Sequence, residues 1–156
     1  MNPANSFYDE PARRLPILDE ADVAVLGGGP GGIGAAVAAA RNGARTIIVE
    51  RSGTFGGMWT SGMLGAIMPC PFVRGIFEEL IESFEKKRGW HQWGNEYGGG
   101  GTYDIETAKL MLDEIVTSAG AVPYFYTQFS DVIREGDHLT GVIVESKEGR
   151  HWHGKV

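Results

Sequence analysis

A run of glycines at positions 27–32, Gly-Gly-Gly-Pro-Gly-Gly, constrains the fold of this chain more than any other feature. The run has the spacing GxGxxG, with Gly27, Gly29 and Gly32 in the three fixed positions. The apolar segment Val23 to Leu26 precedes it, as a buried parallel strand would, and an alanine-rich segment of high helix propensity follows it. A strand, a glycine turn and a helix in this order begin a βαβ unit, so the sequence predicts an α/β fold.

The second half of this unit follows directly. We expect a helix from Ile33 to Asn42 with Gly43 as its C-terminal cap. The β-branched residues at 46–49 predict a second strand, and Glu50 stands at its end. Ala36 and Gly43 are small, as close packing of the helix on the strand requires.

Each part of the unit suits the binding of a nucleotide diphosphate. Gly27 permits a sharp turn, Gly29 lets the backbone approach a pyrophosphate, and Gly32 lets the helix pack closely on the sheet. Unpaired amides and the dipole at the helix N-terminus hold the negative charge, so no basic side chain is needed. Glu50 is placed to accept hydrogen bonds from ribose hydroxyls, and it would repel a 2′-phosphate, which disfavours NADP.

The βαβ unit alone leaves FAD and NAD as alternatives, because both contain ADP. Two later features favour FAD. The sequence Gly56-Gly57-Met58-Trp59 supplies a second glycine pair that can pass under an extended dinucleotide. The strands predicted from Phe129 onward stand where a simple NAD domain would continue with another βα crossover.

On segments 27–32, 49–53 and 56–62, the chain resembles the glutathione-reductase-like flavoproteins and, more closely, the broad family of FAD-dependent oxidoreductases. The resemblance covers Asp22 to Val156. It implies a three-layer, Rossmann-like FAD-binding domain with a β-meander crossover, of which this chain is the N-terminal part. It also implies an oxidoreductase that transfers a hydride between an organic substrate and FAD.

The resemblance assigns further contacts within the cofactor site. The backbone near Phe129 would touch the adenine, Arg51 would lie near the adenosine, and Gly57 and Met58 would run beside the ribityl chain and the isoalloxazine. Catalytic residues are not identified. The predicted cofactor-binding residues are Gly27, Gly29, Pro30, Gly31, Gly32, Glu50, Arg51, Gly57, Met58 and Phe129.

Members of the family continue after the meander with another strand and a substrate domain, whereas nothing follows Val156 here. We therefore expect a second polypeptide or a missing C-terminal region to complete the FAD and substrate sites. Two alternatives remain: an NAD-binding dehydrogenase domain, and a non-catalytic nucleotide-binding subunit of a split flavoenzyme.

The other segments receive simpler predictions. Residues 1–20, with three prolines, are expected to be an extended arm, and residues 21–156 the FAD-binding domain, with 71–119 as a helical insertion and 122–156 as strands and meander. Residues 51–71 are predicted to be a long loop and 89–103 a mobile lid or a plain surface connection. The predicted helices of the insertion run from Pro71 to Arg88 and from the N-cap Asp104 to Ala119, and the later strands are Val122 to Tyr126, Phe129 to Arg134, Leu139 to Glu145 and His151 to Val156.

Composition excludes several partners. The net charge is −6 and the 14 basic residues are scattered, which argues against nucleic acid. The uncharged run 23–40 contains six glycines and Pro30, which argues against a membrane span. The single cysteine, Cys70, is predicted to be a small packed residue and fits a reducing cytoplasm. No metal site is predicted, since His151 and His153 share a strand face with no third ligand evident.

Overall fold

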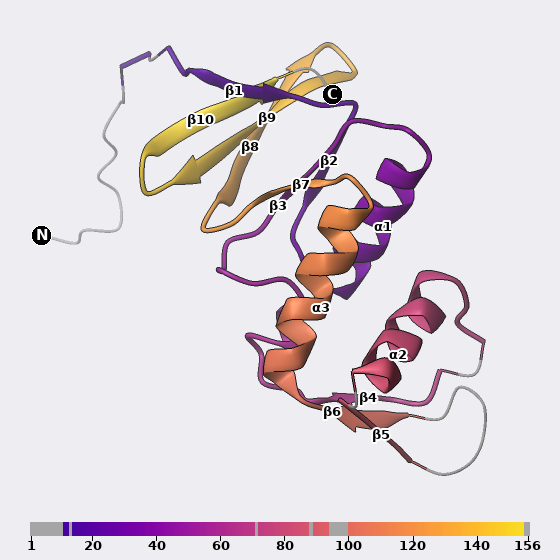
Figure 1. Ribbon diagram of the computed structural model, residues 1–156. Helices are drawn as coiled ribbons and strands as arrows, with labels where there is room; N and C mark the ends of the chain where they lie inside the picture. Colours follow the sequence, from indigo (N-terminus) through magenta and orange to yellow (C-terminus); the bar gives the residue numbers. More distant parts are fainter. Residues whose placement is uncertain (1–10, 13, 71, 88, 94–99, 155–156) are drawn as a thin grey trace, which may run out of the picture.

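The computed structural model describes residues 11–12, 14–70, 72–87, 89–93 and 100–154, the last six of these by their backbone (Figure 1). Its strands are grouped into three sheets. The strands are β1 (Ile17–Glu20), β2 (Val23–Leu26), β3 (Thr46–Val49), β4 (Ala66–Ile67), β5 (Trp90–Gln92), β6 (Gly101–Tyr103), β7 (Val122–Tyr124), β8 (Gln128–Glu135), β9 (His138–Ser146) and β10 (Gly149–Gly154). The helices are α1 (Pro30–Arg41), the 3₁₀ turn η2 (Gly57–Trp59), α2 (Ile76–Lys86) and α3 (Ile105–Ser118).

The centre of the fold is a parallel sheet in the order β2-β3-β7. Helices α1 and α3 pack on one face of it, and the meander sheet β1-β10-β9-β8 lies on the other face (Figure 1). Side chains of a strand alternate between faces, so Ile48 joins the helical core while Val49 packs with Val142 and Val144 of β9. Both predictions, the βαβ unit and the three-layer α/β architecture, are confirmed.

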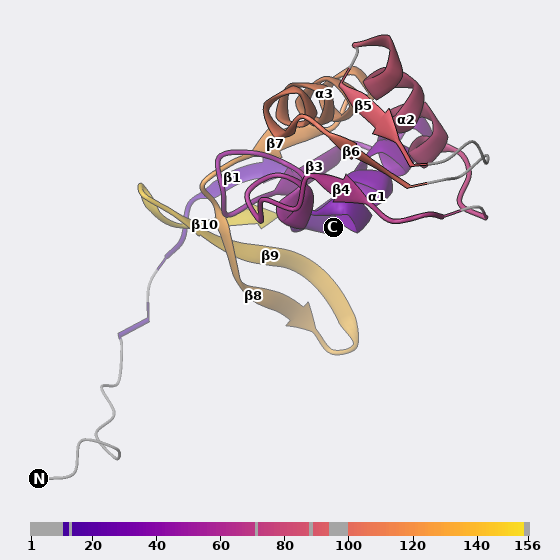
Figure 2. The same ribbon diagram turned by 90° about the horizontal axis from the view of Figure 1, so that it is seen from below.

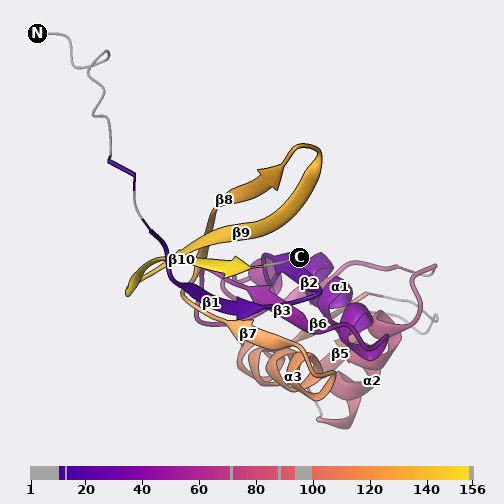
Figure 3. The same cartoon turned by 90° about the horizontal axis from the view of Figure 1, so that it is seen from above.

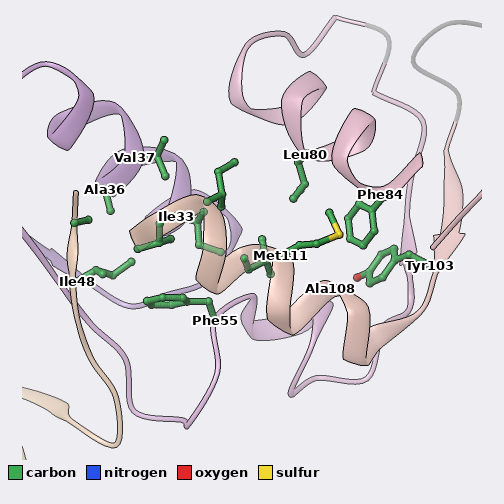
Figure 4. Close-up of a cluster of buried hydrophobic side chains, with 14 of the residues drawn as sticks. Ile33, Ala36, Val37, Ile48, Phe55, Leu80, Phe84, Tyr103, Ala108 and Met111 are labelled. Carbon is green, nitrogen blue, oxygen red and sulfur yellow. The ribbon is translucent and has the colours of Figure 1, made fainter. Parts of the chain in front are cut away.

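The larger core joins all three helices. Val37 of α1, Met111 of α3, and Leu80 and Phe84 of α2 converge on one cluster (Figure 4). Tyr103 from β6 closes its far end, so α2 and the small β4-β6-β5 sheet are held against α3. This cluster fixes the position of α1, whose first turn forms the candidate site.

The predicted meander is confirmed, with β8 and β9 antiparallel and β9 and β10 antiparallel. Figure 2 and Figure 3 show the β8–β9 hairpin extending well away from the helices. Val122–Tyr124 joins the parallel sheet instead, as β7. The last four residues of the predicted arm form β1, which pairs in parallel with β10. Residues 1–10, 13 and 155–156 lie outside the described residues, as do the side chains of His151 and His153.

The predicted start of the first helix in the insertion is wrong. Helix α2 begins at Ile76, well after Pro71, because Gly75 adopts φ +76° and donates its amide to Glu78 Oε2 at 2.9 Å. Phe72, which lies within the predicted helix, is outside α2 and 94% exposed. Residues 71 and 88 themselves lie outside the described residues.

The two ends of the segment 89–103 pair as the strands β5 and β6, so these ends are not loop as predicted. Residues 94–99, between these strands, lie outside the described residues. The predicted long loop 51–71 contains η2 and the short strand β4, and Cys70 within it is only partly buried. Asp104 is the predicted N-cap, and it accepts the Thr107 amide at 2.7 Å. Within the described ranges, no helix combines the length and the apolar character needed to cross a bilayer.

Gly32 provides a test of the contact between α1 and the glycine turn. A Cβ at this position would lie 1.9 Å from the Gly27 carbonyl oxygen, which is backbone and cannot swing aside. We expect Gly32→Ala to lower the free energy of unfolding by about 2 kcal/mol in urea titrations. Gly34→Ala, in the same helix, meets nothing within 4 Å and should be neutral or stabilising. Equal stabilities of the two variants would contradict the close packing.

Tyr103 provides a test of the far end of the core. Its hydroxyl lies 2.8 Å from the Trp59 carbonyl oxygen and 2.7 Å from that of Leu64, and burial raises its pKa to about 12. The folded chain therefore keeps a proton that the unfolded chain releases near pH 10, and stability should fall between pH 10 and 12.

Tyr103→Phe should cost about 1 kcal/mol near neutral pH through the lost hydrogen bond, and should make this alkaline fall shallower. Urea unfolding at several pH values from 8 to 11.5 measures both effects. Burial also raises the pKa of Tyr124 to about 12, so Tyr124 contributes separately to the loss of stability at high pH. Tyr124→Phe is therefore the matched variant. If the stability of Tyr103→Phe falls as steeply at high pH as that of the unaltered chain, this account of Tyr103 is wrong.

Candidate nucleotide-binding site

The candidate site lies where β2 and β3 end and α1 begins. Gly27 follows β2 with φ +109°, a conformation that favours glycine, and its amide donates to the Val49 carbonyl at 2.8 Å. The turn therefore stays tied to the end of β3 while the chain reverses into α1. Both strand ends and the helix start meet at one edge of the sheet, which is the usual ligand position in parallel α/β sheets.

The start of α1 has unused hydrogen-bonding capacity. The helix begins at Pro30, earlier than the predicted Ile33, with Gly29 as an N-cap that has no side chain to satisfy the first amides. Helix geometry leaves the amides of Gly31 and Gly32 without acceptors inside the helix. A Cβ at Gly29 or Gly31 would meet nothing within 4 Å, so open space lies in front of this turn. An anion can approach these amides closely.

The η2 turn lies directly against this helix start. A Cβ at Gly57 would be 3.3 Å from Gly29 Cα and 4.0 Å from Pro30 Cδ. The Gly56 amide donates to the Gly28 carbonyl at 2.8 Å and so fixes the second glycine pair beside the first. Met58, the next residue, is 63% exposed. The structure thus brings the predicted residues Gly57 and Met58 next to the predicted pyrophosphate position.

Glu50 is buried at the end of β3, and both of its carboxylate oxygens are engaged. Oε2 accepts the Gly28 amide at 2.8 Å, and Oε1 accepts the Ser52 amide at 2.7 Å. An ionised carboxylate has about four acceptor positions, so each oxygen can accept one further hydrogen bond. The sequence predicted a ligand contact here, and the structure adds a second role, because Glu50 also holds the glycine turn to the loop after β3.

A pocket of about 240 Å³ opens beside Glu50. It brings together four predicted residues from distant parts of the sequence, namely Gly27, Glu50, Arg51 and Phe129. Its other lining residues are Leu26, Val49, Thr127 and Gln128. Gly57 and Met58 do not line this pocket. The predicted residues therefore fall into two groups, one around the pocket and one at the start of α1.

A larger pocket of about 550 Å³ adjoins the first one. The two share Arg51, Gln128 and Phe129, and the larger one adds Tyr126, Ser130, Glu145, Ser146 and Lys147. Sequence reasoning missed these five additional residues. The β9–β10 turn that carries Lys147 meets the β7–β8 connection only because β8 and β9 pair, with Gln128 opposite Glu145. Nothing near Lys147 in the sequence signals this neighbourhood.

The groups that the structure brings together at this site suit the binding of a nucleotide. Backbone amides, a carboxylate and an open pocket dominate it. In the ranges that the structure describes, no three His, Cys, Asp or Glu side chains come close enough together to hold a metal ion. An ADP group fits this arrangement, with its diphosphate at the amides of α1 and its ribose at Glu50.

Comparison with known proteins supports this interpretation. The family model for FAD dependent oxidoreductases matches residues 22–156. Thiamine thiazole synthase of Methanosarcina barkeri is 31% identical over 145 residues, which are 89% of this chain and 51% of that protein. Mitochondrial dihydrolipoyl dehydrogenase of Caenorhabditis elegans is 45% identical over 51 residues, or 33% of this chain and 10% of that protein.

Solved structures show the same fold. THI4 of Thermovibrio ammonificans has a TM-score of 0.62 at 21% identity, covering 86% of this chain and 54% of that one. A geranylgeranyl bacteriochlorophyll reductase-like protein of Thermoplasma acidophilum has a TM-score of 0.64 at 22% identity, covering 88% and 38%. The chain spans about half the length of the thiazole synthases that it matches.

The two amide contacts of Glu50 generate a stability prediction. Glu50→Gln replaces one acceptor oxygen with an NH₂ donor, so either the Gly28 or the Ser52 amide loses its partner in a buried setting. We expect a loss of about 1–3 kcal/mol in urea unfolding. The exposed Glu135→Gln variant, at the end of β8, is the control and should unfold like the unaltered chain. Unchanged stability of Glu50→Gln would show that these contacts contribute nothing to the fold.

Proposed function

This chain belongs to the FAD dependent oxidoreductase family, and we propose that it is the ADP-binding part of a flavoenzyme that passes a hydride between an organic substrate and FAD. One observation carries the proposal: the uncapped start of α1 and the buried Glu50 lie on the two sides of the Gly27 turn, facing open space. A diphosphate and its ribose need these two groups in this order. FAD is the cofactor of the family.

The roles proposed for the binding residues follow from their chemistry. The amides of Gly31 and Gly32 bind the pyrophosphate, while Gly29 and Pro30 leave room for its approach. Glu50 accepts hydrogen bonds from the ribose hydroxyls. Arg51 and Phe129 lie on the adenosine side of the site, in the pocket beside Glu50.

Gly57 and Met58 lie on the other side of the proposed pyrophosphate position, where the ribityl chain and the flavin of FAD would extend. Gly57 lies against Gly29, so the backbone of η2 can follow the ribityl chain closely. When bound, the flavin supplies the hydride-accepting and hydride-donating ring, and this chain holds and orients it. An NAD-dependent dehydrogenase domain is not favoured, because the matched family uses FAD.

The free edge of β2 supports a partner for this chain. The parallel sheet is ordered β2-β3-β7, so β2 pairs on one side only among the described strands, and Leu26 at its end is 41% exposed. Strands of parallel sheets are normally buried. We propose that a further region of the protein, or a second polypeptide, pairs here and completes the FAD site and the site of a small-molecule substrate.

Substrate identity is not transferred from the relatives. The thiazole synthases are matched over about half of their length, and the part of this chain that matches is the nucleotide-binding part. The shared half therefore predicts the cofactor and leaves the substrate to the remainder of the protein. We propose a cytoplasmic location, which the single Cys70 supports, because a lone cysteine suits a reducing compartment.

Gly29→Val tests the proposed function. Gly29 has φ −73° and ψ 179°, which valine tolerates, and its Cβ would point into open space, so the fold should keep its stability. The added side chain would occupy the approach of the pyrophosphate. We expect the affinity for ADP and for FAD to fall by about 100-fold, equivalent to about 3 kcal/mol.

Isothermal titration with ADP and FAD, together with urea unfolding, measures both quantities. Gly34→Ala, which lies further along the same helix in open space, is the control and should bind like the unaltered chain. The proposal predicts that the unaltered protein, once joined by the region or polypeptide that completes the site, retains flavin absorbance. If Gly29→Val binds ADP and FAD with full affinity, the nucleotide binds elsewhere and the proposal is wrong.

A further inference from the structure

Tyr126 has an unusual conformation for its residue type. Its φ is +52°, in the left-handed region that favours glycine, and its side chain is 63% exposed, so core packing does not account for it. The Tyr126 amide donates to the Ser52 carbonyl at 3.1 Å, which holds the backbone in place. Strained residues of this kind concentrate at binding sites, where the surrounding structure fixes them.

The ring of Tyr126 has a defined position against the loop after β3. A Cβ at Gly53 would lie 2.1 Å from the Tyr126 hydroxyl oxygen and 2.4 Å from Cζ, so the ring lies directly against the Gly53 backbone. The Lys147 ammonium lies 5.7 Å from the centroid of the same ring, within cation–π range. Tyrosine and lysine thus form one unit, although they come from separate turns of the chain.

Three charged side chains line the larger pocket, namely the cations Arg51 and Lys147 and the carboxylate Glu145. Neither Arg51 nor Lys147 has an ion-pair partner among the described residues. Both cations are therefore available to a ligand that enters this pocket. Both guanidinium and ammonium groups are attracted to the face of an aromatic ring.

The order of groups in ADP determines what can reach this pocket. If the diphosphate lies at the start of α1 and the ribose at Glu50, the base must extend away from the helix. The pocket beside Glu50 adjoins the larger pocket, because Arg51, Gln128 and Phe129 line both. A purine base therefore enters the pocket that Tyr126 and Lys147 border.

We propose that Tyr126 and Lys147 form the outer wall of the adenine pocket and set the preference of this site for a purine base. The inference rests on the proposed function and deepens it. The face of the Tyr126 ring and the two cations attract the π-system of the base, whereas the contacts to the diphosphate and the ribose are the same for every nucleotide. The two residues act on binding and base preference, and they take no part in the redox step.

Tyr126→Gly is the sharpest test, because glycine suits φ +52° and so removes the ring while relieving backbone strain. We expect unchanged or higher stability in urea, but an affinity for ADP lower by about tenfold. The preference for ADP over UDP should fall with it, an effect that a purely structural role would not produce. Tyr126→Phe keeps the ring and should bind ADP within about twofold of the unaltered chain.

Lys147→Ala should weaken ADP binding by about threefold, whereas Lys86→Ala, on α2 and 76% exposed, should have no effect. Titration calorimetry with ADP and UDP on the whole chain measures all of these affinities. Unaltered ADP binding and base preference in Tyr126→Gly, with the unaltered chain binding ADP, would overturn this inference alone. Absence of ADP binding by the unaltered chain would instead overturn the proposed function, and this inference with it.

Discussion

The carboxylate of Glu50 is the interaction on which the geometry of the site depends. Through Oε2 it holds the Gly28 amide of the glycine turn, and through Oε1 it holds the Ser52 amide of the next loop. The backbone of Glu50 also accepts the Thr127 amide at 3.0 Å and donates to the Tyr124 carbonyl at 2.9 Å. One residue therefore fixes three separate segments around the pocket. A turn made of glycines has little stiffness of its own, and these contacts provide it.

The layered core explains why the segments meet at this residue. Strand β3 is buried along its whole length, with Ile48 facing the helices and Val49 facing the meander. Its end is consequently the point at which all three layers come together. Glycine at position 32 lets α1 approach the turn closely enough for its first amides to reach the same point. Packing in the core thus sets the distance between the proposed diphosphate and ribose positions.

Much of this could be predicted from local sequence. The βαβ unit, the N-cap at Asp104 and the meander turns each follow from short patterns, and the structure contains all of them. The start of α2 could not be predicted so simply, because Pro71 and Gly75 are both plausible start signals. Helix α2 starts after Gly75 because the positive φ of Gly75 turns the chain there and because Glu78 accepts a hydrogen bond from the Gly75 amide. Pattern reasoning weighs residue types and does not detect which of two local signals the tertiary packing supports.

The remaining errors involve partners that are distant in sequence. Strand β1 exists because β10 lies beside it, and β5 and β6 pair across a glycine-rich segment that looks like a loop. The neighbourhood of Tyr126 and Lys147 likewise depends on strand pairing in the meander. Within the site, short-range patterns therefore predicted the backbone-built end, at the glycine turn and Glu50. At the larger pocket, the family resemblance predicted Arg51 and Phe129, whereas Tyr126 and Lys147 required the fold.

This contrast has an electrostatic reason. A diphosphate can be held in an acidic protein without lysine or arginine, because helix amides lie close to it and keep their orientation at no cost when it arrives. Such a site depends on glycines at fixed spacing, which is why it is visible in the sequence. A base has no charge for the amides to hold, and the rings and cations proposed to border it come from segments that only the assembled layers bring together. The two ends of one ligand thus place different demands on the chain, and only the diphosphate end leaves a regular spacing in the sequence.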